Sequence, residues 1–225
     1  MPSADPATIA RHSMVDGQLR PNRINNNVLL DIFARIPREA FVATPLRAVA
    51  YADDHIAMTT ATPKRTMFTP LVQASVLQAL EIQPHHKVLV VAAGTGYMAA
   101  VIAALGAQVV AVEGEKAVFQ YTRNNLADAG CTNVQVLQGA PEAGAPAHAP
   151  FDRIVVDAPA AVVPAALFGQ LVEGGKLSAI VRGADGLMEA TIYTLHQGKP
   201  VPQVLFEARC GALLPNFAQA EGFAF

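Results

Sequence analysis

Two glycines and an acid stand where a nucleotide-like cofactor would need them. Gly94 and Gly96 flank Thr95 directly after one apolar run, and Glu113 ends the next apolar run. Glycines let the backbone approach a ligand at a helix N-terminus, and a carboxylate at the tip of a strand accepts hydrogen bonds from the two hydroxyls of a ribose. The pattern therefore predicts a site for a ribose-containing cofactor.

The segment Lys87–Glu113 contains the elements that would position these residues. A β-branched run, Val88–Val91, precedes the glycine turn, and small residues at helical spacing follow it. A second run, Val109–Val112, then leads to the acid. Strand, turn, helix and strand in this order predict a βαβ unit of a parallel sheet. A tight turn without any ligand would use the same glycines, but the acid at the end of the second strand favours a ligand.

The rest of the chain alternates helical and strand patterns. Helices are expected over 8–19, 26–34, 71–80, 116–129 and 164–171, and strands over 134–137, 153–156, 176–181, 190–195 and 203–207. Asp157 follows one of these strands, where a ligand role and a loop-capping role are equally compatible with the sequence. The segment 51–64 has no sustained periodicity and is expected to be an irregular loop. We predict a doubly wound, mostly parallel Rossmann-like sheet over 71–225 with an antiparallel C-terminal edge, preceded by a helical extension over 1–70.

The composition limits the classes of function. The 225 residues are 52% hydrophobic and 15% charged with a net charge of −2, which is typical of a packed globular protein without a basic surface for nucleic acid. No apolar run approaches the roughly 20 residues that span a bilayer, and the N-terminus lacks a signal-peptide core. Cys131 and Cys210 belong to no CxxC pair, which favours a reducing compartment. We expect a cytoplasmic protein that binds neither nucleic acid nor membrane.

Segments over most of the chain resemble the protein-L-isoaspartate O-methyltransferase family. They are Val15-x-x-Gln18-Leu19, Ile36-Pro37-Arg38-Glu39-x-Phe41-Val42, Tyr51-x-Asp53, Val88-Leu89, Gly94-Thr95-Gly96-Tyr97, Val112-Glu113, Asn133-Val134, Gly139, Pro150-Phe151-Asp152 and Gln170-Leu171-x-x-Gly174-Gly175. The signature that begins at Pro37 is more specific than the glycine turn. The resemblance implies a class I methyltransferase fold, S-adenosylmethionine as the methyl donor, and an isoaspartyl carboxylate of a protein or peptide as the acceptor.

The resemblance also implies which residues bind the cofactor. They are Ala92, Gly94, Thr95, Gly96, Tyr97, Glu113, Gly139 and Ala140. Two of them depart from the family, because Ala92 stands for a glycine and Ala140 for the acid that binds the adenine amino group. The lost acid removes one hydrogen bond, worth roughly 0.5–1.5 kcal/mol or up to about tenfold in affinity. The added methyl of Ala92 is tolerated if the φ of that residue is negative.

The segment Thr66–Pro70 aligns with the family's loop beside the transferred methyl group. The hydroxyl-bearing position of that loop falls on Phe68, and Thr69 is the neighbouring hydroxyl that would substitute if the loop shifts. Thr69 is therefore the candidate catalytic residue. Methyl transfer to an ionised carboxylate needs positioning and a dry site, and neither a base nor a metal. No metal is expected, since no second cluster supports Asp53-Asp54-His55.

Two other classes of function stay open. The residues Phe68, Ala92 and Ala140 also suit a catalytically silent or differently specific family member that serves as a cofactor-binding or interaction protein. A nicotinamide-dependent oxidoreductase would use the same glycine turn. Nothing downstream supplies a hydride-transfer acid or a Tyr-x-x-x-Lys pair, so the methyltransferase is the leading hypothesis.

Overall fold

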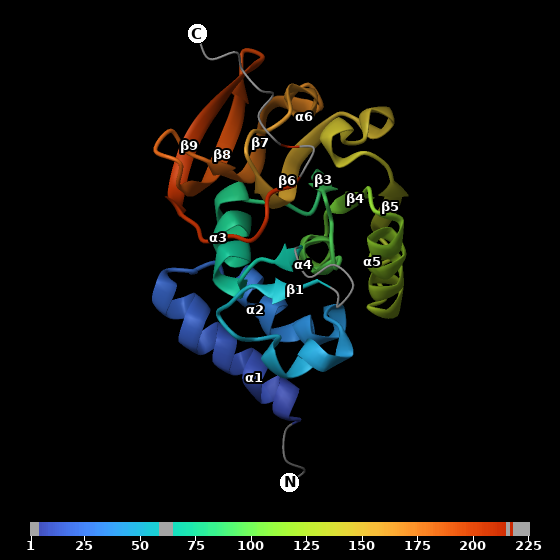
Figure 1. The fold of residues 1–225 in the computed structure, drawn as a ribbon, viewed down its shortest axis with the longest axis vertical. Helices are drawn as coiled ribbons and strands as arrows, with labels where there is room; N and C mark the ends of the chain where they lie inside the picture. Colours follow the sequence, from blue (N-terminus) through green and yellow to red (C-terminus); the bar gives the residue numbers. More distant parts are fainter. Residues whose placement is uncertain (1–4, 59–64, 215–216, 218–225) are drawn as a thin grey trace.

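The computed structural model describes residues 5–58, 65–214 and 217, and its centre is a seven-stranded sheet (Figure 1). The strands are β3 (Lys87–Val91), β4 (Gln108–Glu113), β5 (Val134–Gln138), β6 (Phe151–Ala160), β7 (Leu171–Arg182), β8 (Met188–His196) and β9 (Lys199–Glu207). Their order is β5-β4-β3-β6-β7-β8-β9, with parallel pairing from β5 to β7 and antiparallel pairing from β7 to β9. The predicted fold class is confirmed.

The two faces of the sheet bury alternate residues of its strands, as the period of two requires. In β3, Val88 and Val90 belong to one apolar cluster and Leu89 and Val91 to the other. The first cluster includes residues of α3 (Pro70–Leu80), α4 (Tyr97–Ala104) and α5 (Lys116–Asp128), and the second lies under α6 (Ala165–Phe168). The carboxyl ends of β3, β4 and β6 therefore meet at one edge, between these layers.

The N-terminal extension packs on α3 and α4, the helices that cover the first of these faces. It contains α1 (Pro6–Met14), a π-helical turn (Val15–Leu19), α2 (Asn27–Arg35) and 3-10 turns over Arg20–Asn22, Arg38–Phe41 and Thr44–Val49. Phe33 and Phe41 contact the ring of Tyr97 edge-on, with centroids 6.2 and 5.5 Å apart. The extension is thus fixed to the helix that follows the glycine turn.

The expectation of an irregular loop over 51–64 is wrong in part. Residues 59–64 lie outside the described residues. On either side of them β1 (Ile56–Ala57) pairs antiparallel with β2 (Thr66–Met67), and we call this pair the β1–β2 hairpin. The backbone N–H of Met58 extends the pairing by donating to the carbonyl of Arg65, at 2.9 Å. Two-residue strands are too short to leave a periodic pattern in the sequence. The expected helix over 164–171 is also shorter, because β7 already begins at Leu171.

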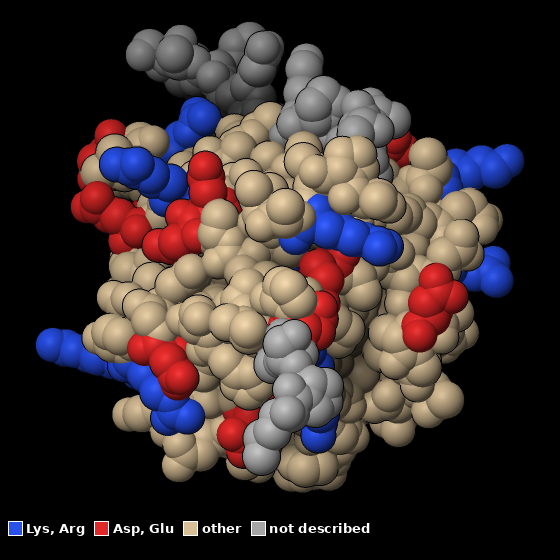
Figure 2. All heavy atoms as spheres, turned by 90° about the horizontal axis from the view of Figure 1, so that it is seen from below, with Lys and Arg blue, Asp and Glu red and all other residues tan. Residues whose placement is uncertain are grey.

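Neither the charged surface nor the edge strand of the sheet indicates a further binding site in the part of the chain that the structure describes. Acidic and basic side chains are interspersed among uncharged ones on the face in Figure 2. Strand β9 pairs with β8 alone among the described residues, and it carries Pro200 and Pro202, which cannot donate to another strand. Within the described ranges, no helix combines the length and the apolar character that a membrane crossing needs.

Candidate active site

The turn after β3 adopts the backbone conformation that its glycines allow. Gly94 and Gly96 have φ values of +56° and +87°, and Gly96 directly precedes α4. A Cβ on Gly94 would lie 2.4 Å from Cε of Met58 and 2.8 Å from its sulfur. Glycine is therefore needed at position 94 for its conformation and for the close approach of Met58.

Ala92 has a φ of +57°, so the condition under which its added methyl would be tolerated without strain is not met. A non-glycine residue in this left-handed region carries a steric cost of about 1–2 kcal/mol, because Cβ approaches the following carbonyl. The methyl of Ala92 is fully buried in the apolar cluster below the sheet. Ala92 thus adopts a left-handed backbone conformation that glycine adopts without strain, and its Cβ makes that conformation unfavourable.

We expect Ala92→Gly to change the free energy of unfolding by no more than about 0.5 kcal/mol, because strain relief offsets the lost methyl burial of about 0.8 kcal/mol and the added chain entropy. Ala93 is equally buried and has no positive φ, so Ala93→Gly is the matched control. It should destabilise by about 1.5 kcal/mol. Urea unfolding of both variants measures the difference, and equal losses would show that Ala92 is not strained.

Glu113 is 1% exposed and lies at the carboxyl end of β4. Its two oxygens accept five hydrogen bonds, from the backbone N–H groups of Gly94 (3.0 Å), Gly114 (2.9 Å) and Glu115 (3.3 Å) and from Nη1 (2.8 Å) and Nη2 (3.1 Å) of Arg65. A carboxylate offers about four lone-pair directions, so this one is saturated. The backbone donors fix its orientation, and the guanidinium fork of Arg65 covers its outer side.

Residues of the β1–β2 hairpin thus occupy the space above the predicted cofactor-binding residues. Met58 lies on Gly94, and Arg65 pairs with Glu113 and also donates to the carbonyl of Ala92 at 3.4 Å. Nε of Arg65 is buried and has no hydrogen-bond partner among the described residues. The buried acid and the glycine backbone fit a ribose-containing cofactor, provided that the side chains of Arg65 and Met58 withdraw.

The other predicted cofactor-binding residues lie in two places. Gly139 and Ala140 follow β5, whereas Thr95 and Tyr97 lie at the glycine turn and the start of α4. Gly139 donates its N–H to the carbonyl of Glu113 at 3.1 Å, and Ala140 directly precedes the 3-10 turn Pro141–Ala143. Thr95 is 2% exposed, and its hydroxyl accepts from the N–H of Tyr97 at 3.3 Å. The ring of Tyr97 packs into the N-terminal extension, where burial raises its pKa to about 12. Tyr97 therefore supports the turn from the side of the extension.

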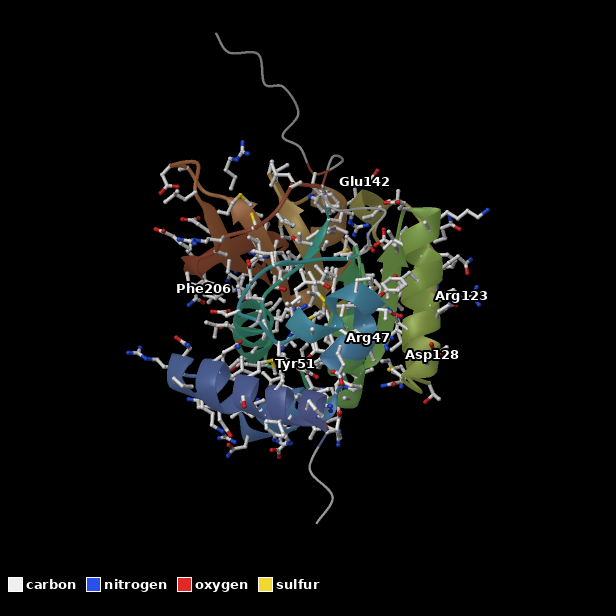
Figure 3. The ribbon with its side chains drawn as sticks, turned by 60° about the horizontal axis from the view of Figure 1, so that its bottom comes forward. Arg47, Tyr51, Arg123, Asp128, Glu142 and Phe206 are labelled. Atoms are coloured by element: carbon white, nitrogen blue, oxygen red, sulfur yellow. The ribbon has the colours of Figure 1, made fainter. Side chains whose placement is uncertain are left out.

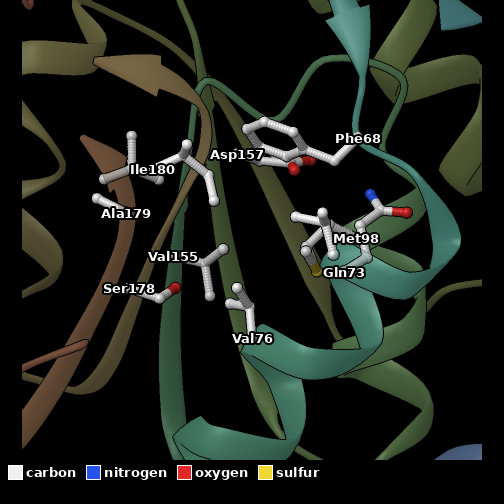
Figure 4. A pocket seen from close by; sticks show the side chains of 11 residues that line it. Phe68, Gln73, Val76, Met98, Val155, Asp157, Ser178, Ala179 and Ile180 are labelled. Atoms are coloured by element: carbon white, nitrogen blue, oxygen red, sulfur yellow. The ribbon is translucent and has the colours of Figure 1, made fainter. Parts of the chain in front are cut away.

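We call Thr66–Pro70 the acceptor segment. None of its hydroxyls is among the donors to Glu113 in the described part of the chain. Phe68 is 3% exposed, and it lines the same small cavity as Asp157 (Figure 4). The hydroxyl of Thr69 accepts from the N–H of Val72 at 3.3 Å and so caps α3. Thr69 borders a separate cleft with Asp53, Asp54, His55 and residues 205–209. The structure therefore does not bring the candidate catalytic Thr69 to the predicted cofactor site, and its role stays a prediction.

Arg38 is a residue of the site whose role the sequence did not reveal. It is fully buried and donates to three acceptors, the carbonyls of Ala50 (2.8 Å) and Phe68 (2.6 Å) and the side-chain oxygen of Gln73. Its guanidinium also lies 5.0 Å from the ring centroid of Tyr97. The specificity of the signature that begins at Pro37 was the available signal. Arg38 joins the extension, the acceptor segment and α3, so it holds the backbone of Phe68 in place.

Asp157 is the second carboxyl group at this edge. It is 5% exposed, and burial raises its pKa to about 8, although the positive charges of Arg38 and Arg65 act in the opposite direction. It lines a small cavity together with Phe68, Val155 and Ser178, among others. Asp157 is therefore mostly protonated at neutral pH.

The raised pKa of Asp157 predicts a pH-dependent stability. The unfolded chain releases this proton near pH 4, while the folded chain keeps it until about pH 8, so the folded state binds more protons in between. The free energy of unfolding of the wild type therefore falls as the pH rises from about 4 to about 8, by the amount that Asp157 contributes. We therefore expect Asp157→Asn, which cannot titrate, to gain stability relative to the wild type as the pH rises from 5 to 8. Denaturant unfolding at several pH values tests this, and a constant difference would contradict the assignment.

The chain is similar in sequence to known methyltransferases. The model of the family described as protein-L-isoaspartate(D-aspartate) O-methyltransferase matches residues 10–197. A protein-L-isoaspartate O-methyltransferase of Methanoculleus marisnigri is 38% identical over 178 residues, 79% of this chain and 80% of the relative. One of Pelobacter propionicus is 34% identical over 213 residues, 95% of this chain and 92% of the relative.

Solved structures agree on the fold. A structure described as protein-L-isoaspartate O-methyltransferase matches with a TM-score of 0.81 and 24% identity, and covers 92% of this chain and 67% of its own. A structure from Plasmodium falciparum, in complex with S-adenosyl-L-homocysteine, matches with a TM-score of 0.76 and 18% identity over 91% of this chain and 98% of its own. At these identities the likeness supports the class I methyltransferase fold.

Proposed function

This chain belongs to the protein-L-isoaspartate(D-aspartate) O-methyltransferase family, and we propose that its cofactor binds around Glu113, between the glycine turn and the β1–β2 hairpin. The protein is an S-adenosylmethionine-dependent methyltransferase of this family. The observation that carries the proposed site is the buried carboxylate of Glu113, held by three backbone N–H groups at the carboxyl end of β4.

Different residues would bind the ribose, the amino-acid part and the adenine of the cofactor. Glu113 would accept hydrogen bonds from the ribose hydroxyls, and Gly94 and Gly96 would let the backbone approach the amino-acid part. Gly139 and Ala140 would border the adenine through their backbone, since Ala140 has no acid to offer. When it is bound, S-adenosylmethionine supplies a methyl group on a positively charged sulfur.

We propose that the acceptor is an isoaspartyl carboxylate in a damaged protein or peptide. Its oxygen forms a bond to the methyl carbon as the carbon–sulfur bond breaks, and the electron pair of that bond returns to sulfur. No proton is transferred, so the step needs neither a base nor a metal. The chain contributes positioning and the exclusion of water, through the buried ring of Phe68 and the backbone that Arg38 holds. Thr69 stays the candidate for a catalytic hydroxyl if the segment shifts.

Two measurements test this function. Calorimetry with S-adenosylhomocysteine should detect binding, and labelled methyl groups from S-adenosylmethionine should appear on an isoaspartyl peptide and not on the aspartyl peptide of the same sequence. Absence of binding at millimolar ligand would refute the proposed site. Binding without transfer to the isoaspartyl peptide would favour a silent or differently specific family member.

Three further expectations stay proposals. We propose that 1–70 and 71–225 act as an extension and a methyltransferase domain, a division supported by the position of the extension on one face of the sheet. We also propose a cytoplasmic location and damaged proteins as partners. The two unpaired cysteines, whose pKa values burial raises, support a reducing compartment.

A further inference from the structure

We propose that Arg65 has two partners in turn, Glu113 before the cofactor binds and the acceptor carboxylate afterwards. Arg65 would then compete with the cofactor and recognise the substrate in one reaction cycle. This inference rests on the proposed function, because it assigns a recognition residue to the acceptor of that reaction.

The first half follows from the saturation of Glu113. Arg65 binds it through both Nη atoms, at 2.8 and 3.1 Å, and the three backbone donors take the remaining positions. A ribose diol needs two acceptor positions on the same carboxylate. Because the backbone donors are fixed by the ends of β3 and β4, the positions that can be vacated are those of Arg65. The cofactor and Arg65 therefore exclude each other at Glu113.

The released guanidinium stays at the active site. Arg65 directly precedes β2, and its carbonyl accepts the N–H of Met58, so its backbone is held in the hairpin. Arg65 and Phe68 lie in the same short segment, and Arg38 holds the carbonyl of Phe68. The side chain of Arg65 is 18% exposed, so part of it already reaches solvent while it is paired with Glu113. The movement that frees the carboxylate of Glu113 is therefore a side-chain rotation of Arg65.

A carboxylate is the ligand that this released group suits. The guanidinium fork matches a carboxylate with two parallel hydrogen bonds, and Nε of Arg65 is a buried donor without a partner among the described residues. Arg38 is not suited to this role, because it is fully buried and each of its three nitrogens already donates to Ala50, Phe68 or Gln73. Phe68, in the same segment as Arg65, has no polar group to offer a carboxylate. Arg65 supplies the recognition that this position lacks.

Asp157 is the competing partner for the released guanidinium. It faces the site from β6, and its electrostatic neighbours include Arg38 and Glu113 as well as Arg65. Burial raises the pKa of Asp157 to about 8, so it is mostly neutral at pH 7 and attracts Arg65 less than an ionised acceptor does. The order of events follows. The cofactor binds first and frees Arg65, and the acceptor carboxylate then takes Arg65 as its partner.

The test compares Arg65→Met and Arg65→Lys with the wild type. Met keeps the apolar stem and removes the charge, whereas Lys keeps the charge without the fork. Arg123→Met is the matched control, because Arg123 is exposed on the outer side of α5 (Figure 3). Calorimetry with S-adenosylhomocysteine measures the competition without any turnover, and KM for an isoaspartyl peptide at saturating S-adenosylmethionine measures the recognition. Thermal unfolding checks that each variant is folded.

Opposite changes of the two constants are the expected signature. Arg65→Met should bind S-adenosylhomocysteine about tenfold more tightly, as expected when two charge-assisted bonds no longer compete, and should raise KM for the peptide about tenfold or more. Arg65→Lys should change both constants less, and Arg123→Met should change neither.

Each half of the inference can fail by itself. Weaker or unchanged binding of S-adenosylhomocysteine by both Arg65 variants would overturn the competition. An unchanged KM in a variant that methylates the peptide would overturn the recognition while the proposed function stands. If the wild type binds S-adenosylhomocysteine but methylates no isoaspartyl peptide, the function and the recognition half fail together, and the binding comparison still decides the competition.

Discussion

Replacing Glu113 with alanine is expected to remove detectable binding of S-adenosylhomocysteine and to lower the free energy of unfolding by about 3–5 kcal/mol. Both effects come from one buried carboxylate. Its loss leaves the guanidinium of Arg65 without its main partner and three backbone N–H groups without an acceptor. The ribose hydroxyls lose their acceptor at the same time, so the affinity falls with the stability.

Two companion variants separate these effects. Glu113→Gln keeps the shape and one oxygen, so it should remain more stable than the alanine variant while its binding is still weakened. Glu115→Ala removes an exposed acid two residues further along and should leave both quantities nearly unchanged. Chemical denaturation and calorimetry measure the series. Full binding by a folded Glu113→Ala would show that the cofactor does not use this carboxylate.

Replacing Arg38 with methionine should have the second largest effect, a loss of about 3–4 kcal/mol of stability. Methionine fills much of the space, but it leaves the carbonyls of Ala50 and Phe68 and the amide of Gln73 unsatisfied in the interior. Each buried unsatisfied group costs about 1–3 kcal/mol, and the total stays at the low end of the sum because the variant no longer buries a charge. For a chain of this size the melting temperature should fall by roughly 6–16 °C.

The control for Arg38→Met is Arg47→Met, which removes the same charge from an exposed position (Figure 3). It should change the melting temperature by no more than about 2 °C. Arg38→Lys should lie between the two, because one ammonium group cannot reach all three acceptors in the fork geometry. A methionine variant as stable as the wild type would show that the three contacts of Arg38 contribute nothing measurable.

The sequence was sufficient for the sheet and for the edge that carries the site. The apolar runs before Gly94 and Glu113 predicted β3 and β4, because strands buried on both faces leave continuous apolar segments. The acid at the end of β4 followed from the same pattern. These features depend on local spacing, which a single chain displays directly.

The acceptor side of the site could not be predicted in the same way. The pair of Arg65 and Glu113 joins two residues far apart in the chain, and a hairpin of two-residue strands leaves no period to detect. The positive φ of Ala92 could not be predicted either, because in a sequence only glycine commonly indicates a positive φ. Arg38 was visible as part of a signature, but its three acceptors come from separate segments. What sequence reasoning missed is long-range pairing.

The contact of Phe33 and Phe41 with Tyr97 has a consequence for synthesis of the chain. A ribosome adds about 5–20 residues per second and delivers the N-terminal end first. The extension therefore emerges before the helix against which its aromatic rings pack, and its apolar cluster also includes residues as late as Ala208. Its apolar surface stays without native cover for seconds during translation. We therefore expect heat stress to cause aggregation of nascent chains before it affects the folded protein. Chaperones that bind apolar segments would protect these nascent chains.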